Sequence, residues 1–224
     1  MARQKTVPET DNYDPEPRWP ALVAVLAVAG LYFALPDALI VGPRWVFPLV
    51  VTILVIPTVI ANAKGAHRLN KILGFSVTAV LTIGMIISVA LLIWDLVDND
   101  EKRGKQLLVS AACLWATNVL VFTLWYWRLD AGGPHARDKR LEHTDGSFLF
   151  PQMTMPPDAK EAADEVNWQP NFFDYLFLAF NTSTAFSPTD VPVLARWAKI
   201  LMMLQSVISL TVLALLAARA VNIL

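Results

Sequence analysis

The sequence predicts an all-α integral membrane protein with about five transmembrane helices and a short re-entrant helix before the last one. Hydrophobic residues make up 55% of the 224-residue chain, the mean hydropathy is +0.47, and the apolar residues fall in long blocks between polar segments. A helix needs roughly 20 mostly apolar residues to cross a hydrocarbon core of about 30 Å, and several blocks have that length. The lipid bilayer is therefore the expected partner of most of the surface.

Charge and cysteine content narrow the function classes. The net charge is -1 and the charged residues concentrate in the tail and the loops, so the chain has no basic footprint for a nucleic acid. The single cysteine, Cys113, lies in an apolar block, which excludes an intramolecular disulfide and a cysteine-based metal cluster.

Residues 1–18 are polar, mixed in charge and contain several prolines, which predicts a disordered polar tail. A cleaved signal peptide begins with basic residues and lacks acids, whereas Glu9, Asp11, Asp14 and Glu16 stand ahead of the first apolar block. We therefore interpret that block as a membrane anchor.

Residues 19–130 are expected to hold four spans, at residues 21–40, 45–63, 72–94 and 107–127. Tryptophans at their ends support these bounds, because Trp prefers the headgroup level of a bilayer. Pro36 and Asp37 are expected to bend or end the first span. In the second span, Pro48 and Pro57 each free a backbone carbonyl, and Thr52 and Thr58 are close enough in sequence to help satisfy it.

The last 54 residues, 171–224, are expected to form a re-entrant helix, a polar turn and the final span from residue 193 onward. Arg196 and Lys199 lie at one end of that span and Arg219 at the other. The apolar run at residues 172–180 makes a helix of only about 15 Å, half of what a span needs. A chain that enters and returns would put residues 181–190 at membrane depth as irregular backbone, which is tolerated only when it is buried or lines a watery cavity.

The candidate site is the turn written "NTSTAFSPTD". As a pore-lining or filter-like element it comprises Asn181, Thr182, Ser183, Thr184, Ala185, Phe186, Ser187, Thr189 and Asp190. Gln205 and Ser209 are one helical turn apart in the final span and are expected to face this turn. Asn118, in the fourth span, either lines a path with them or bonds across helices. Asp174 either caps the short helix or joins Asp190 in an acidic entrance that concentrates cations.

Residues 131–170 are predicted to be a polar loop, with a short surface helix starting at Pro157. His135 and His143, with Asp138, Glu142 and Asp145 nearby, match no compact metal-ligand pattern, so we expect a solvated loop without a metal. The basic residues Arg137, Lys139 and Arg140 either touch anionic headgroups or are simply solvated. No cofactor is predicted.

The short helix, Thr-rich turn, acidic exit and long helix resemble the pore module of potassium channels. Residues 184–187 take the place of the Val-Gly-Tyr-Gly part of the channel filter, and residues 190–192 take the place of its acidic exit. Ala185 and Ser187 stand where the channels have glycines, and Pro188-Thr189 is an insertion. Because Ala and Ser adopt the left-handed backbone only at a cost, this argues against potassium selectivity.

Residues 19–224 also resemble a bacterial integral membrane protein family of unknown function. The residues that carry this resemblance are 174–180, 182–187, 189–190 and 196–210. The resemblance implies the fold and a place in the bacterial inner membrane, and it brings no activity.

Two function classes follow from the sequence. Lys and Arg collect on the cytoplasmic side, and a cytoplasmic N-terminus puts most of the 18 there; the exceptions are Arg44, Lys102, Arg103, Lys105 and Arg219. One class is a homo-oligomeric permeation protein for a cation, with copies of the turn meeting around an axis. The other is a non-conducting structural or partner-docking membrane module. The sequence has no Ser/His/Asp or Cys/His arrangement and no phosphate-cradling glycine loop, so an enzyme is not expected.

Overall fold

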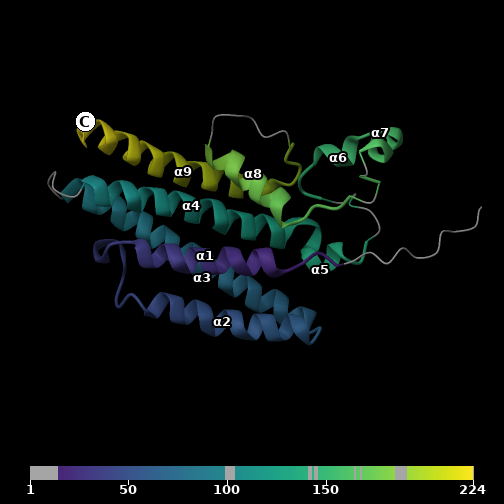
Figure 1. Cartoon of the computed structure of the whole chain (residues 1–224), viewed down its shortest axis with the longest axis horizontal. Helices are drawn as coiled ribbons and strands as arrows, with labels where there is room; N and C mark the ends of the chain where they lie inside the picture. The colour runs from purple at the N-terminus through teal and green to yellow at the C-terminus, as the bar shows by residue number, and fades with distance from the viewer. Residues whose placement is uncertain are drawn as a thin grey trace, which may run out of the picture.

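The computed structural model describes residues 15–98, 104–140, 143, 146–163, 165–166, 168–184 and 191–223. Apart from one antiparallel bridge between Phe148 and Val193, these ranges are helical or irregular. The predicted all-α class is therefore confirmed (Figure 1).

The helices are, in chain order, α1 (Trp19–Ala34), η1 (Asp37–Leu39), α2 (Val46–Ala63), α3 (His67–Asp98), α4 (Gly104–Leu129), η3 (Asp130–Gly132), α5 (Pro134–Arg137), α6 (Pro151–Thr154), α7 (Pro157–Ala162), α8 (Phe172–Thr184) and α9 (Arg196–Ile223). In the part of the chain that the structure describes, four segments are long and apolar enough to cross a membrane: Val46–Ala63, His67–Asp95, Gln106–Arg137 and Arg196–Ala218. They correspond to the predicted second to fifth spans. A multi-pass arrangement is thus plausible from length and composition.

The first predicted span is shorter than expected. Helix α1 has 16 residues and ends at Ala34, where Leu35 turns to an extended backbone. Pro36 follows with ψ of 156°, and the separate 3-10 turn η1 begins at Asp37. The predicted bound at residue 40 is therefore wrong, whereas the expectation that Pro36 and Asp37 bend or end the segment is confirmed, because proline has no N–H to extend the hydrogen-bond ladder. At about 24 Å, α1 falls short of the hydrocarbon core.

In α2, the threonines do not satisfy the carbonyl freed by Pro57, contrary to the prediction from the sequence. Proline frees the carbonyl four residues earlier, which is Ile53 for Pro57. The hydroxyls of Thr52 and Thr58 instead donate to the carbonyls of Pro48 and Leu54, at 2.7 and 2.6 Å. Each threonine hydroxyl thus bonds to the carbonyl four residues before it, and neither donates to the Ile53 carbonyl.

Helix α4 is the centre of the bundle, because it contacts α1, α3, α8 and α9. Its side chains Val121, Phe122, Leu124 and Tyr126 are almost fully buried. Helix α2 packs on the outside of α3. Large apolar side chains such as Ile53 of α2 and Val207 of α9 are 58% and 62% exposed, which suits a lipid-facing surface better than a watery one.

Six helix termini gather at one end of the bundle, which we call the polar end; they are Trp19, Ala63, His67, Leu129, Phe172 and Arg196 (Figure 1). Aromatic side chains pack against one another at this end. The ring centres of Trp127 and Phe172 are 5.8 Å apart, and those of Trp197 and Phe148 are 6.0 Å apart. The short helices α5, α6 and α7 lie at this same end. Helix α7 starts at Pro157 as predicted and stops at Ala162.

Candidate functional site

Helix α8 begins with a reciprocal cap. The Asn171 side chain accepts from the Phe173 N–H at 2.8 Å, and the Asp174 carboxylate accepts from the Asn171 N–H at 2.7 Å. Asn171 is thus the N-cap residue, with its side chain bonded to the second residue of the helix and the acid at the third residue bonded back to its N–H. The helix-capping interpretation of Asp174 is therefore confirmed. Burial raises the pKa of the Asp174 carboxyl, and the Asn171 N–H opposes that effect.

Helix α8 then runs inward from the polar end and stops partway along α4. Its 13 residues cover about 20 Å. Phe172 packs on Trp127 at the end of α4, whereas the Ser183 carbonyl lies 3.5 Å from the indole nitrogen of Trp115. The distance from Trp127 to Trp115 along α4 is about 18 Å.

After α8 the chain comes back to the end where α8 began. Val193 pairs with Phe148, and the Phe148 ring lies 6.2 Å from Tyr175 near the start of α8. Helix α9 then starts at Arg196 beside the same ring cluster and runs the full length of α4 in the opposite direction (Figure 1). Helices α8 and α9 therefore start at the same end.

The predicted turn divides into two parts. Asn181, Thr182, Ser183 and Thr184 form the last turn of α8, so the expectation of irregular backbone there is wrong. The hydroxyls of Thr182 and Thr184 donate to the carbonyls of Leu178 and Asn181, so both are satisfied without a break in the helix. Ala185, Phe186, Ser187, Pro188, Thr189 and Asp190 lie outside the described residues, and so does the predicted acidic entrance at Asp190.

Gln205 and Ser209 face α8, as expected from their spacing. The Gln205 amide nitrogen donates to the Ala179 carbonyl and to the Ser183 hydroxyl, both at 2.7 Å. Its amide oxygen accepts from the Tyr126 hydroxyl at 2.5 Å. The Ser209 hydroxyl donates to the Ser183 carbonyl. Every polar atom of the Gln205 side chain thus has a partner.

We call these five residues, Asn118, Tyr126, Ser183, Gln205 and Ser209, the polar latch. Asn118 completes it by donating to the Gln205 carbonyl at 3.2 Å. All five side chains are 0–1% exposed. Because the Ser183 carbonyl is one of the last four of α8 and has no intrahelical partner, the latch also caps that helix end. Asn118, Gln205 and Ser209 therefore bond across α4, α8 and α9.

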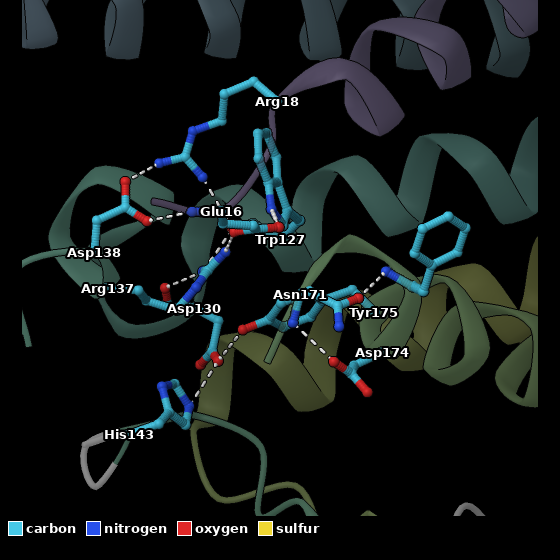
Figure 2. Close-up of polar contacts among 11 residues, drawn as sticks. Glu16, Arg18, Trp127, Asp130, Arg137, Asp138, His143, Asn171, Asp174 and Tyr175 are labelled. Atoms are coloured by element: carbon cyan, nitrogen blue, oxygen red, sulfur yellow. Dashed lines mark hydrogen bonds and ion pairs between the residues drawn. The ribbon is translucent and has the colours of Figure 1, made fainter. Parts of the chain in front are cut away.

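A second buried polar group lies at the polar end and was not predicted (Figure 2). We call it the charged cluster; it comprises Glu16, Arg18, Asp130, Arg137, Asp138, His143 and Tyr175. Glu16 accepts from the guanidinium groups of Arg18 and Arg137, each at 3.1 Å, and from the Trp127 indole at 2.7 Å. Burial lowers the pKa of Arg18, and the Asp138 and Glu16 carboxylates oppose that effect.

Arg137 caps the end of α4. Its guanidinium donates to the carbonyls of Trp127 and Asp130, at 2.9 and 3.1 Å, and lies 5.0 Å from the centre of the Tyr175 ring. A cation is favoured at a helix C-terminus, where unpaired carbonyls concentrate negative charge. Arg137 is 2% exposed and His143 is 6% exposed. The prediction of a wholly solvated loop is therefore wrong for these two residues.

Asp130 joins the loop to the helices. Its carboxylate accepts from the Ser147 N–H at 2.5 Å and from the Tyr175 hydroxyl at 2.7 Å, and the His143 Nε2 lies 3.5 Å away. One sequence signal could have indicated this. An acid directly after a helix end opposes the helix dipole, so Asp130 behind "LWYWRL" needed a partner from elsewhere.

Neither buried group has the features of a metal centre. Within the described ranges, the structure gathers no group of three or more His, Cys, Asp or Glu side chains able to hold a metal ion. Of the loop residues considered at the start, Glu142 and Asp145 lie outside those ranges.

Comparison of the chain with protein-family models, with curated proteins and with solved structures finds no match. Within the described ranges, the structure shows an all-α chain with four apolar helices of membrane-spanning length.

Proposed function

We propose that the chain is a multi-pass membrane protein in which α8 is a re-entrant helix, and that the unit formed by α8 and α9 is a non-conducting structural module. One observation carries the second part. The polar side chains expected to line a path, Asn118, Gln205 and Ser209, make hydrogen bonds inside the chain and are 0–1% exposed.

Buried polar groups that satisfy one another stabilise a helix contact and leave few acceptors for a passing ion. Of these three side chains, only the Asn118 Oδ1 lacks a partner within the described ranges. Ion flux across liposomes that contain the purified protein tests this proposal. We expect no flux of K⁺ or Na⁺ above that of empty liposomes. A cation flux that Asp190→Asn abolishes would overturn it.

The re-entrant part of the proposal is supported by the common starting end of α8 and α9. It is tested by labelling single cysteines in a Cys113→Ala background with a membrane-impermeant maleimide. Phe173 and Phe180 are both exposed on the outer face of α8, at 57% and 46%. We expect Phe173→Cys to react from the side of the polar end only and Phe180→Cys to be protected from both sides. Reaction of Phe180→Cys from the opposite side would contradict a re-entrant helix.

The second candidate is the oligomeric cation-permeation protein, with residues 185–190 around a shared axis. It is favoured by the inward direction of α8, because the negative end of the helix dipole then points toward the middle of the bundle, where it would favour a cation. A strict monomer in detergent argues against it, and an oligomer whose flux depends on Asp190 supports it.

We also propose that the protein lies in a bacterial inner membrane with the polar end in the cytoplasm. The basic residues Arg68, Lys71, Lys139, Arg196 and Lys199 at that end support this orientation. A reporter enzyme fused after Leu224 is expected to be active on the periplasmic side, and activity on the cytoplasmic side would reverse the orientation.

A further inference from the structure

Two adjoining cavities open at the polar end, between the ends of α1, α2, α3 and α4. Their volumes are about 250 Å³ and about 370 Å³. They share four lining residues, Asn70, Arg128, Pro134 and His135. Arg128 therefore stands where one cavity passes into the other.

The larger cavity is strongly basic. Its titratable lining residues are His67, Arg68, Lys71, Arg128, His135 and Lys139, and none of its lining residues is a carboxylate. The carboxylates of the nearby charged cluster are already paired, Asp138 with Arg18 and Glu16 with Arg137. The four permanent cations around this cavity strongly favour an anionic ligand.

Arg128 is the unusual member of this set. Its Nε is buried without a hydrogen-bond partner, and no hydrogen bond or ion pair between described residues includes its side chain. Its guanidinium lies over the Trp127 ring, 5.3 Å from the centre, and packs against Gly74, where any Cβ would overlap it. Arg128 as a whole is partly exposed, and a guanidinium whose buried Nε lacks an acceptor is costly. A phosphate would supply acceptors in the two-pronged geometry that arginine favours.

The smaller cavity is apolar below Arg128. Leu22 and Val25 of α1, Val55 and Val59 of α2, and Val77 of α3 line it. From the level of Asn70 to that of Val77 along α3 it reaches about 10 Å into the apolar part of the bundle. Such a space suits the upper part of a hydrocarbon chain and not a free polar ion.

We propose that the paired cavities bind an anionic phospholipid, with its phosphate on Arg128 and the neighbouring cations and one acyl chain in the apolar cavity. Basic pockets between transmembrane helices on the cytoplasmic side are suited to such headgroups. The depth fits as well. Trp19 and Trp127 line the smaller cavity at this level, and Trp is the residue that favours the headgroup layer.

The test uses the purified full-length protein in detergent, titrated separately with phosphatidylglycerol, phosphatidylcholine and inorganic phosphate. The readout is the rise in the midpoint of thermal unfolding and the ligand concentration that gives half of that rise. We expect a saturable rise with phosphatidylglycerol and a much smaller one with the other two. Inorganic phosphate acting at the same concentration as phosphatidylglycerol would overturn the lipid assignment in favour of a free anion.

Two matched double variants distinguish binding at a specific site from general attraction of the lipid to a basic surface. Arg68→Gln with Lys71→Gln removes two exposed cations from the cavity lining at the start of α3. Arg196→Gln with Lys199→Gln removes two exposed cations with the same spacing at the start of α9, outside the cavities.

We expect the α3 pair to raise the half-saturating concentration of phosphatidylglycerol roughly thirtyfold, and the α9 pair to change it by less than about threefold. Equal weakening by both pairs would overturn the proposal. Lys139→Gln, which follows α5 and is also exposed, is expected to weaken binding roughly fivefold and serves as a second test if the α3 pair folds poorly. Val59→Trp fills the apolar cavity and should weaken binding of the lipid without changing the response to inorganic phosphate.

Discussion

The polar latch makes a quantitative prediction for Gln205→Leu. Leucine has nearly the same volume but cannot bond, so the change removes the bonds from Gln205 to Ala179, Ser183 and Tyr126. Hydrogen bonds between membrane helices contribute about 0.6 kcal/mol each, so the three together contribute about 2 kcal/mol. The Tyr126 hydroxyl is left buried without its partner, which adds roughly 1 kcal/mol or more.

We therefore expect Gln205→Leu to lower the free energy of unfolding by about 2–4 kcal/mol. The assay is unfolding of the purified protein in mixed detergent micelles, followed by circular dichroism. Thr211→Val is the matched control on the same helix, because the Thr211 hydroxyl is exposed and bonds only to the Val207 carbonyl of its own helix. It is expected to change the free energy by less than about 0.5 kcal/mol.

A double-mutant cycle with Ser183→Ala identifies the source of the loss. If the two side chains bond as the structure shows, the two changes are not additive, and the coupling energy is at least about 0.5 kcal/mol. A loss below about 0.5 kcal/mol for Gln205→Leu, or strictly additive effects of the two changes, would refute the reasoning that the latch holds α8 between α4 and α9.

Three further changes test other contacts of the polar end by the same unfolding assay. Asp130→Asn keeps the shape but removes the charged acceptor of the Ser147 N–H and the Tyr175 hydroxyl, and it should cost about 2 kcal/mol; an unchanged stability would show that the charged cluster does not hold the loop. Asp174→Ala removes the capping acid of α8 and should cost about 1 kcal/mol, with no cost indicating that the cap is dispensable. Gly133→Ala puts a Cβ 2.8 Å from the Arg128 carbonyl at a φ of +95° and should cost about 2 kcal/mol, whereas Gly30→Ala, with no neighbour within 4 Å, should cost nothing.

The long helices were predictable because the signal for them is local. A run of apolar residues ended by tryptophan and by charge predicts α2, α3, α4 and α9 without any knowledge of their neighbours. The end of α1 was predictable in part, since Pro36 and Asp37 were expected to bend or end that segment, although Pro57 lies inside α2 without ending it. The spacing of Gln205 and Ser209 likewise indicated one shared face, although their partners on α8 had to come from the structure.

The charged cluster was not predictable in the same way. From the sequence, Arg137 is predicted to be one of a run of solvated basic residues. Only its position at the C-terminal end of α4 explains why it is buried. Its partner Glu16 lies 121 residues earlier in the sequence, before α1, and no spacing rule connects the two residues. Burial of a charge depends on partners that arrive from elsewhere in the chain, so it becomes visible only once the helices are packed.

The sequence by itself determined which segments are apolar enough to cross a membrane, that α8 is too short to do so, and that Pro36 interrupts the first apolar segment. These properties depend on residue type and spacing along one helix. The tertiary structure decided that α8 and α9 start from the same end and that Ser183 bonds to Gln205 and Ser209 of α9. It also decided that Arg128 lies between two cavities, where its side chain has no hydrogen bond or ion pair with another described residue. Those features depend on contacts between residues far apart in the chain, and such contacts exist only when hydrophobic packing has brought the helices together.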